Sequence, residues 1–382
     1  MNLLDTISSS KTKTELFKFK GNSNADEFHA YIHITDNSLT FNQQVEYMAD
    51  AVSKLKDCFP ENTRCIIARF HVSDAANQTE TIKQTFAVIT DCPISIIQQP
   101  PLDGTKMAIW INAISNSEII SCKQDSILYK HNGYQHLWTT ANADGSMNTY
   151  EQTTDLFNRY SEIAITKEMT LEANCRRTWL YVNDIDNHYS DVVVGRNDVF
   201  DKENLTDSTH YIASTGITGY TGKKGVNVKM DTYSINGLQN EQTQYLYATS
   251  HLNRTSEYGV RFERGVAILY GDRTHAFISG TASIDDKGNI LYPLDINGQI
   301  WRMWENVEAL LSEVGMNMEQ DIAMMTIYLR DIADYEIVKS RFDTRFPNHP
   351  KAIVLAPVCR PGWLIEMECI CVKAANTNQK DF

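Results

Sequence analysis

The sequence lacks most features that mark zinc, nucleic-acid and membrane proteins. Its eight cysteines include no CxxC pair and no His/Cys cluster at zinc spacing, so they are predicted to be reduced, mostly buried thiols. Only 35 Lys and Arg residues stand against 48 Asp and Glu residues, and the resulting net charge of −13 argues against a nucleic-acid surface. No apolar run approaches the length of a membrane span, and the first residues lack a basic region followed by an apolar core. These absences predict a cytoplasmic protein with no nucleic-acid or membrane partner.

Cofactor motifs are missing as well. The chain has no phosphate-binding loop, no HExxH, no dinucleotide fingerprint and no Gly-x-Ser-x-Gly, so neither a cofactor nor a metal is implied. What is present is typical of a globular protein, with 42% hydrophobic and 22% charged residues. A length of 382 residues predicts two or three units with a large core.

One order of elements recurs three times: a strand, a long helix, a strand, a short helix and two further strands. The junctions before the short helices resemble one another, reading Phe-His-Val-Ser-Asp74, Leu-Tyr-Val-Asn-Asp184 and Ile-Tyr-Leu-Arg-Asp331. We therefore predict three homologous α+β modules; the alternative is two unrelated domains that share a generic α+β order. The predicted units are an N-terminal extension and three modules, separated in part by a linker around 115–130, with the bounds 1–26, 27–120, 128–238 and 258–374.

The predicted modules require a particular assembly. Two helices would cover one face of each sheet, and the other face would be apolar and would need cover. Three such sheets packed around an axis would bury these faces. The sequence therefore predicts a single-chain pseudo-trimer.

The last module ends in two strand-like segments, Ala352 to Val358 and Trp363 to Val372, joined by Cys-Arg-Pro-Gly. Such a turn predicts an antiparallel hairpin. Within the second segment Glu366 and Glu368 share one face, because side chains alternate along a strand. They could be ordinary carboxylates of a solvent-facing strand. Alternatively, burial and mutual repulsion could raise the pKa of one of them and make it a general acid.

The third module closely resembles the YjgF/Rid family, which includes endoribonuclease L-PSP-like proteins. The segments that carry the resemblance are Phe-Ile-Ser-Gly-Thr-Ala-Ser-Ile284, Thr-Ile-Tyr-Leu-Arg-Asp331 and Trp-Leu-Ile-Glu-Met-Glu-Cys-Ile-Cys-Val372. The resemblance implies a chorismate-mutase-like fold with clefts between modules and makes Glu366 the pocket carboxylate. Deaminating members carry an Arg after the Pro that opens the last hairpin, where this chain has Lys351, which cannot form the bidentate fork with a carboxylate. The old family label of translation initiation inhibitor or ribonuclease fits poorly with the acidic charge.

Most of the chain from about residue 130 onward is similar to chorismatases, which resemble extended YjgF modules. The matching segments include Ser279 to Ser283, Val358 to Arg360 and Arg177 to Trp179, together with Gly-Arg-Asn197 and Ala-Ser-Thr-Gly-Ile217. This resemblance implies cofactor-free hydrolysis of the enolpyruvyl ether of chorismate, or of a similar dicarboxylate, with release of pyruvate. Glu366 would be the general acid.

The remaining candidate residues would bind the substrate. Arg177, Arg360 and Lys351 could hold its carboxylates, with Arg196 behind them, although each could equally form a structural ion pair. Hydroxyls of Thr281 and Ser283 could donate to a carboxylate or merely cap a strand end, and Ser214 and Thr215 offer a similar nest. Tyr211 could stack on a ring or belong to the core. Cys359 could shape the product outcome or be an inert thiol.

Three functions remain open at this point. The leading hypothesis is the chorismatase-like hydrolase or lyase, and its enzyme alternative is a Rid-like imine or enamine deaminase anchored by Lys351. The third is a non-catalytic binder of small carboxylates. Only the third copy has the Glu-x-Glu pair, which the stretches Ala108 to Asn112 and Val226 to Met230 lack, so one competent cleft is expected, walled by the middle module. The partner would be a small carboxylate metabolite, and the chain would act as a monomeric pseudo-trimer or a higher homo-oligomer.

Overall fold

The computed structural model describes residues 2–382 and contains three six-stranded sheets of the same topology. Their strand orders are β1-β2-β3-β6-β4-β5, β7-β8-β9-β12-β10-β11 and β13-β14-β15-β18-β16-β17. In each sheet the last strand of the module is inserted between the third and the fourth. The prediction of three repeated α+β modules is confirmed.

The elements of each module follow the same sequence, apart from short additional helices. The first module contains β1 (Asn2–Ser8), β2 (Thr12–Phe19), β3 (Glu27–Ile34), α1 (Phe41–Asp57), β4 (Thr63–Val72), α2 (Ala75–Thr90), β5 (Ile94–Gln98) and β6 (Met107–Ser115). The second contains β7 (Glu118–Cys122), β8 (Ser126–His131), β9 (Tyr134–Asn142), α3 (Thr149–Ile165), α4 (Leu171–Asn174), β10 (Cys175–Val182), α5 (Ile185–Lys202), β11 (Ala213–Thr218) and β12 (Val228–Asn236). The third contains η1 (Asn240–Gln242), β13 (Thr243–Leu246), η2 (Thr255–Tyr258), β14 (Gly265–Leu269), β15 (Arg273–Ala282), α6 (Ile296–Ser312), α7 (Met318–Asp321), β16 (Ile322–Leu329), η3 (Ile332–Asp334), α8 (Tyr335–Arg345), β17 (Lys351–Leu355) and β18 (Ile365–Ala374).

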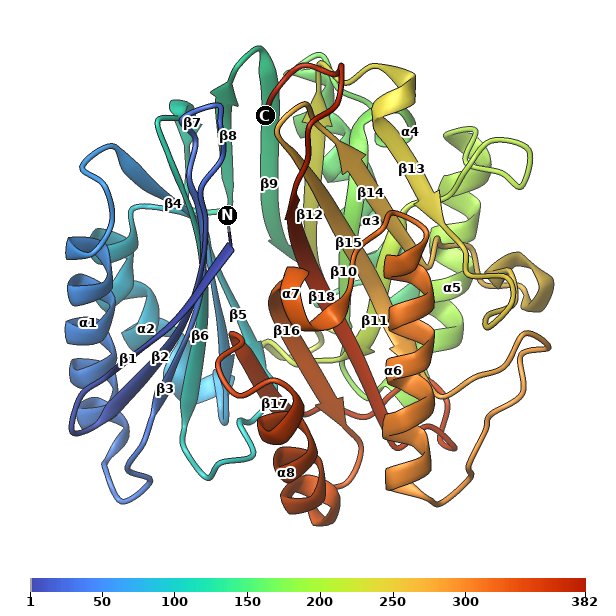
Figure 1. Ribbon diagram of the computed structural model, residues 1–382. Coiled ribbons are helices and arrows are strands. Elements are labelled where there is room, and N and C mark those ends of the chain that lie inside the picture. The colour runs from blue at the N-terminus through green and yellow to red at the C-terminus, as the bar shows by residue number, and fades with distance from the viewer. Residues whose placement is uncertain (1) are drawn as a thin grey trace.

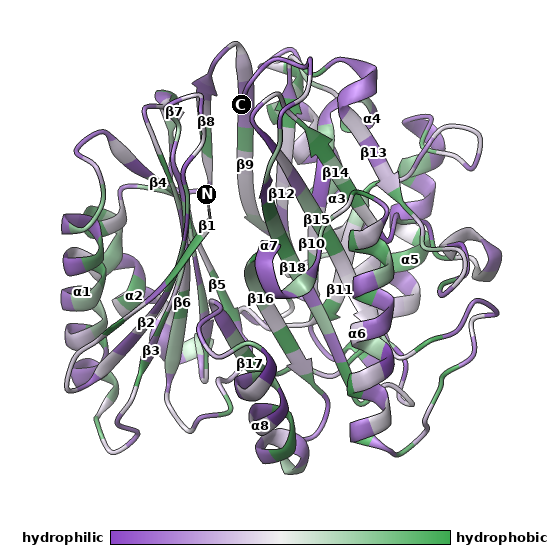
Figure 2. Cartoon of the chain, in the orientation of Figure 1, coloured by the Kyte–Doolittle hydropathy of each residue, from purple (hydrophilic) through white to green (hydrophobic). Residues whose placement is uncertain are grey.

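Helices α1, α3 and α6 each begin at a residue whose side chain caps them. Thr40 and Asn148 form capping boxes at the starts of α1 and α3, and Asp295 accepts from the Gly298 amide at the start of α6. Figure 1 shows the helices on the outside of the molecule, and Figure 2 shows α1 and α6 banded with hydrophilic and hydrophobic residues. The buried residues of α1 and α6 recur at helical spacing, so these two helices pack an apolar stripe against their sheets.

Four strands on one side of the first two sheets differ from the sequence expectation. Residues 2–19, expected within an extension, form β1 and β2 of the first sheet, and the expected linker around 115–130 forms β7 and β8. The edge strand β7 consists of exposed and half-exposed residues and so lacks the apolar signal of a central strand, whereas six of the eight residues of β2 are buried. The module boundaries themselves remain a prediction.

The expected closing hairpin is absent from the third sheet. β17 pairs in parallel with one side of β16, and β18 pairs antiparallel with its other side, so β16 separates them. The connection of residues 356–364 crosses the end of β16 rather than making a tight turn, and its Val358 bridges to Ile217 of the second module. Insertion of β18 next to β16 allows every residue of β16 to be buried.

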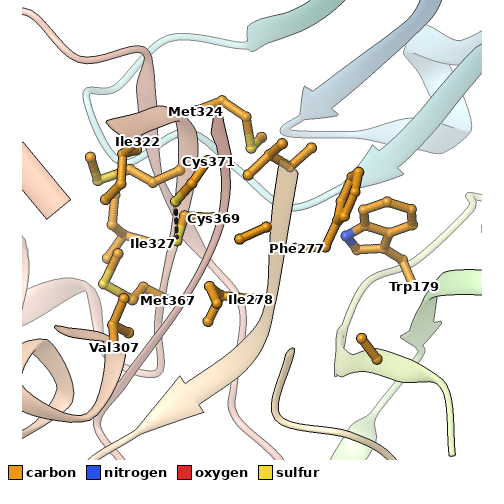
Figure 3. Packing of buried hydrophobic residues seen from close by; sticks show 14 of the residues in the cluster. Trp179, Phe277, Ile278, Val307, Ile322, Met324, Ile327, Met367, Cys369 and Cys371 are labelled. Carbon is orange, nitrogen blue, oxygen red and sulfur yellow. Dashed lines mark hydrogen bonds between the residues drawn. The ribbon is translucent and has the colours of Figure 1, made fainter. Parts of the chain in front are cut away.

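The inner faces of the three sheets meet at the centre, as Figure 1 shows. One hydrophobic cluster unites aromatic residues of all three modules, among them Tyr31, Trp179 and Phe277. In Figure 3, Phe277 lies on the side facing Trp179, whereas Met367 and Cys369 lie beside Ile327 and Val307. β18 therefore packs against α6 on one face and against the other modules on the opposite face.

The central faces were expected to be apolar, but they also hold a buried ion cluster that joins the modules. The Arg69 guanidinium lies 3.1 Å from Asp231 and 3.9 Å from Glu368 and stacks over Trp179 at 4.5 Å. Arg177 lies 2.8 Å from Glu368. Each module contributes at least one charge, so the cluster fixes how the sheets sit against one another.

None of the helices within residues 2–382 is long and apolar enough to cross a membrane.

Glu368→Gln is expected to lower the free energy of unfolding by about 3 to 5 kcal/mol, because it leaves the buried Arg69 and Arg177 charges under-compensated. Urea denaturation followed by tryptophan fluorescence measures the change. The control is Asp186→Asn, which breaks the 2.8 Å ion pair of Asp186 with Arg330, in which the aspartate is 42% exposed, and should cost less than about 1 kcal/mol. Equal small effects of the two substitutions would contradict the central role of the cluster.

Candidate active site

A cleft of about 440 Å³ lies between the second and third modules. The second module supplies one wall through α5 and β11, and the third supplies the other through β15, β18 and the connection of residues 356–364. Its polar and aromatic lining residues are Tyr189, Ser190, Arg196, Ser214, Phe262, Arg264, Cys359, Arg360, Trp363 and Glu366. The expectation that the middle module forms the second wall is confirmed.

Glu366 lies at the base of this cleft and is 5% exposed. Burial and the neighbouring Glu368 raise the pKa of its carboxyl to about 8, against the opposing effect of Arg264 and Arg177. Gly280 makes this position possible, since a Cβ there would lie 2.1 Å from a Glu366 carboxylate oxygen. At neutral pH the group is therefore a protonated carboxylic acid that faces a cavity.

Glu368 has a different environment although it shares the face of Glu366. Its carboxylate accepts from Arg177 at 2.8 Å, from Trp179 Nε1 at 2.9 Å and from the Thr215 hydroxyl at 2.5 Å. The Thr215 hydroxyl oxygen in turn accepts from the Gly280 amide at 2.9 Å. Glu368 thus joins the third module to the second through hydrogen bonds. Of the two glutamates, it is Glu366 that lines the cleft.

Arginines give the cleft a strongly positive lining. Arg196 and Arg264 are buried, and Arg264 donates to the backbone and side-chain oxygens of Asn253 at 3.2 and 3.1 Å. Arg360 stacks over the Trp363 ring at 4.8 Å. Guanidinium groups bind carboxylates with a matching geometry, so this lining is suited to an anionic ligand.

Five of the residues predicted from the sequence meet in the cleft, namely Glu366, Arg360, Cys359, Arg196 and Ser214. Burial, followed by the charge of Glu366, raises the pKa of the Cys359 thiol to about 12. It is therefore an uncharged wall of the cavity rather than a nucleophile.

The other predicted binding residues do not line the cleft. Arg177 lies beneath it with Glu368, and Tyr211 stacks against Phe200 with ring centroids 6.2 Å apart. The hydroxyls of Thr281 and Ser283 each donate at 2.9 Å to a backbone carbonyl, of Ser279 and Leu291 respectively. These hydroxyls act within the fold, as the strand-capping alternative expected.

Lys351 lies in another cleft altogether, between the third and first modules. Its ammonium is 3.3 Å from Glu15 and 3.2 Å from Asp343. That cleft has a volume of about 410 Å³ and contains Ala108.

The strand registers show that three clefts are equivalent: the Lys351 cleft, the Glu366 cleft, and a cleft between the first and second modules that contains Lys229. Glu366 pairs with Tyr328, Lys229 with Tyr181 and Ala108 with His71, each on the neighbouring central strand of its own sheet. The sequence comparison had matched the Glu-x-Glu pair to the stretch Val226 to Met230, whereas the register matches it to Lys229 and Asp231. The equivalent position is therefore occupied by Glu366 in the third module, Lys229 in the second and Ala108 in the first.

The register also shows which residue faces each of these positions. Ser214, Ile94 and Lys351 occupy equivalent positions on β11, β5 and β17. Ser214 lines the cleft of Glu366, and Lys351 lines the cleft of Ala108. Glu366 and Lys351 therefore do not share a cleft.

Arg264 is the site residue that sequence reasoning missed. It lies in the short segment between η2 and β14, which has neither a motif nor a periodic pattern. Only the approach of this segment to β11, where Glu263 bridges to Ala213, brings Arg264 into the cleft. Within residues 2–382 no group of three or more His, Cys, Asp or Glu side chains could hold a metal ion.

Residues 265–373 match the family described as Endoribonuclease L-PSP. A RutC family protein of Saccharolobus solfataricus is 32% identical over 100 residues, which cover 26% of this chain and 79% of that protein. The chain belongs to the RutC family. A second RutC family protein, from Pyrococcus abyssi, is 32% identical over 99 residues, which cover 25% of this chain and 77% of that protein.

The fold of this RutC family chain extends beyond the matched module. A crystal structure of chorismatase superposes with a TM-score of 0.62 at 17% identity and covers 81% of this chain and 93% of that one. The likeness shows that the two share the three-module fold, as the sequence resemblance implied.

Glu366→Gln is expected to make the protein more stable than wild type above about pH 8. A raised pKa in the folded state means that folding holds a proton that the unfolded chain releases, so wild-type stability falls as pH rises from about 4.5 to about 8. The loss amounts to roughly 2 to 5 kcal/mol, and the neutral amide removes it.

Urea denaturation at a series of pH values measures this difference. Glu319→Gln, at a glutamate whose side chain is 48% exposed, serves as the matched control and should follow the wild-type curve. Parallel curves for wild type and Glu366→Gln would mean that Glu366 is ionised in the folded protein at neutral pH.

Proposed function

We propose that this chain hydrolyses the enolpyruvyl ether of chorismate, or of a similar dicarboxylate, and releases pyruvate. The observation that carries the proposal is a carboxyl group with a pKa near 8, buried at the base of an arginine-lined cleft. The three-module fold shared with a chorismatase supports it.

The chemistry needs an acid that remains protonated near neutral pH. Enol ethers resist water until the methylene carbon is protonated, and in the proposed reaction Glu366 gives its proton to that carbon. The product is an oxocarbenium-like cation, which the newly formed Glu366 carboxylate stabilises. Water then adds to the cationic carbon and returns a proton to Glu366, and the hemiketal collapses to pyruvate and the ring alcohol.

In this proposal the arginines that line the cleft orient the substrate. A dicarboxylate presents two negative groups, and Arg196, Arg264 and Arg360 offer guanidinium groups around one cavity. Their positive charge also favours the ionised form of the substrate carboxylates, which is the form that guanidinium groups bind. Trp363, over which Arg360 stacks, adds an aromatic wall for a six-membered ring.

The imine deaminase alternative is less well supported. It relies on a cation that anchors the substrate carboxylate near Glu366 at the position of Lys351, and that position in the Glu366 cleft is Ser214. A non-catalytic binder of carboxylates would use the same arginines but would not need an acid with a raised pKa.

Wild-type protein is expected to release pyruvate from chorismate, and Glu366→Gln should lower the rate by about 10²- to 10⁴-fold, the usual contribution of general acid catalysis. A coupled lactate dehydrogenase assay measures the rate, and Glu319→Gln should match wild type. No pyruvate at high enzyme concentration would reject the proposal. Thermal shifts with chorismate but no turnover would indicate the binder, and ammonia release that Lys351→Met abolishes would indicate the deaminase.

The pH dependence of kcat/KM should follow the protonated form of Glu366. The rate constant is expected to be level below about pH 8 and to fall about tenfold per pH unit above it, because only the carboxylic acid can protonate the substrate. Initial rates over a range of pH measure the profile. A rate that rises with pH through 8 would assign Glu366 the role of a base instead.

A further inference from the structure

The cleft between the first and second modules is the equivalent of the candidate active site. Helix α2 and β5 form one wall and β9 and β12 the other, as α5, β11, β15 and β18 do in the Glu366 cleft. Its volume is about 750 Å³, larger than the 440 Å³ of the active-site cleft. The space is sufficient for a small organic molecule.

Lys229 occupies in this cleft the place that Glu366 holds in the active site. It is 3% exposed, lies 3.1 Å from Asp231 and donates to the Thr140 hydroxyl oxygen. An ammonium group has three N–H donors, and within the described residues Lys229 donates one hydrogen bond, to Thr140, and forms an ion pair with Asp231. A buried, charged donor is therefore left for a group inside the cleft.

The charge around Lys229 leaves it a net attraction for anions. Asp231 is shared, because its carboxylate also accepts from Arg69 at 3.1 Å and from the Ser95 hydroxyl at 2.7 Å. Across the connected cluster, two carboxylates, Asp231 and Glu368, balance three buried cations, Arg69, Arg177 and Lys229. Burial lowers the pKa of the Lys229 ammonium and Asp231 opposes that shift, so a second negative group nearby would favour the charged form further.

Neutral hydrogen-bonding groups surround the ammonium. The Thr140 hydroxyl accepts from Lys229 and also hydrogen-bonds the Asp231 carboxylate, and Asn142 and Thr221 line the same cleft. At the mouth, three lysines are matched by three acidic residues, so the rim adds little net charge; the six are Lys83, Lys123, Lys223, Glu80, Asp91 and Asp125. Selectivity would therefore come from the base of the cleft.

We propose that this cleft is a second ligand site, in which the Lys229 ammonium binds the carboxylate of a small organic acid. A buried ammonium with a donor to spare can hold a carboxylate as a point charge and donate to one of its oxygens. Catalysis of the active-site kind is excluded here, because an ammonium in place of Glu366 and Ile94 in place of Ser214 supply no carboxylic acid. The site binds, and its ligand differs from the substrate in needing one carboxylate rather than two.

Benzoate and its neutral isostere benzamide test the proposal by isothermal titration calorimetry at neutral pH. Ala87→Trp fills the cleft from an exposed position on α2, and Val88→Trp, on the adjacent residue, which is 85% exposed and outside the cleft, is the matched control. Wild type and Val88→Trp should bind benzoate at one more site than Ala87→Trp does, and benzamide should not bind there. Lys229→Met should weaken this site about tenfold to a hundredfold, the value of a hydrogen bond to a charged group.

The benzoate titrations and the pyruvate assay distinguish binding at the Lys229 cleft from the function of the Glu366 cleft. Equal benzoate binding by wild type, Ala87→Trp and Lys229→Met would overturn the proposal. If Lys229→Met does not fold, Ala87→Trp still decides, because its side chain enters from an exposed helix position. Pyruvate release by Ala87→Trp should equal that of wild type, so failure of the proposed hydrolysis and failure of this site give different results.

Discussion

The buried carboxylate of Glu368 is the contact on which the rest of the structure depends. It accepts from Arg177, Trp179 and Thr215 of the second module and lies within 3.9 Å of Arg69 of the first, while its own strand belongs to the third. Because side chains alternate along β18, fixing Glu368 also fixes Glu366 two residues away on the same face. The negative charge of Glu368 then helps to keep Glu366 protonated. The contacts of Glu368 thus hold the modules together, and its charge helps to raise the pKa of Glu366.

The repeated topology produces three equivalent clefts that are lined by different residues. In a symmetric homotrimer every cleft would carry the same residues. Here the central position is Glu366 in one cleft, Lys229 in the next and Ala108 in the third. The different residues suit the first cleft to acid catalysis and the second to anion binding. Neither role requires any change in the backbone, because the strand registers are the same.

Sequence patterns predicted the elements whose periodicity is strong and the residues that belong to motifs. The helices and central strands were recognised, and so were Glu366, Arg360 and Cys359. Strands β1, β2, β7 and β8 had been assigned to an extension and a linker; the exposed edge strand β7 gives a weak apolar pattern, whereas β2 is mostly buried. The prediction of a closing hairpin was wrong, because a turn sequence does not reveal that β16 lies between the two strands it connects, β17 and β18. Arg264 and Lys229 acquire their roles from register and from contacts between modules, which no local pattern encodes.

Covalent connection of the modules has a consequence for how the cleft responds to concentration. A site built between separate subunits is lost when the assembly dissociates on dilution. In this chain both walls of the Glu366 cleft belong to one polypeptide, and Val358 and Ile217 already bridge them. The effective concentration of one wall for the other is set by the length of the connecting chain. The cleft therefore stays assembled however few copies of the protein a cell contains.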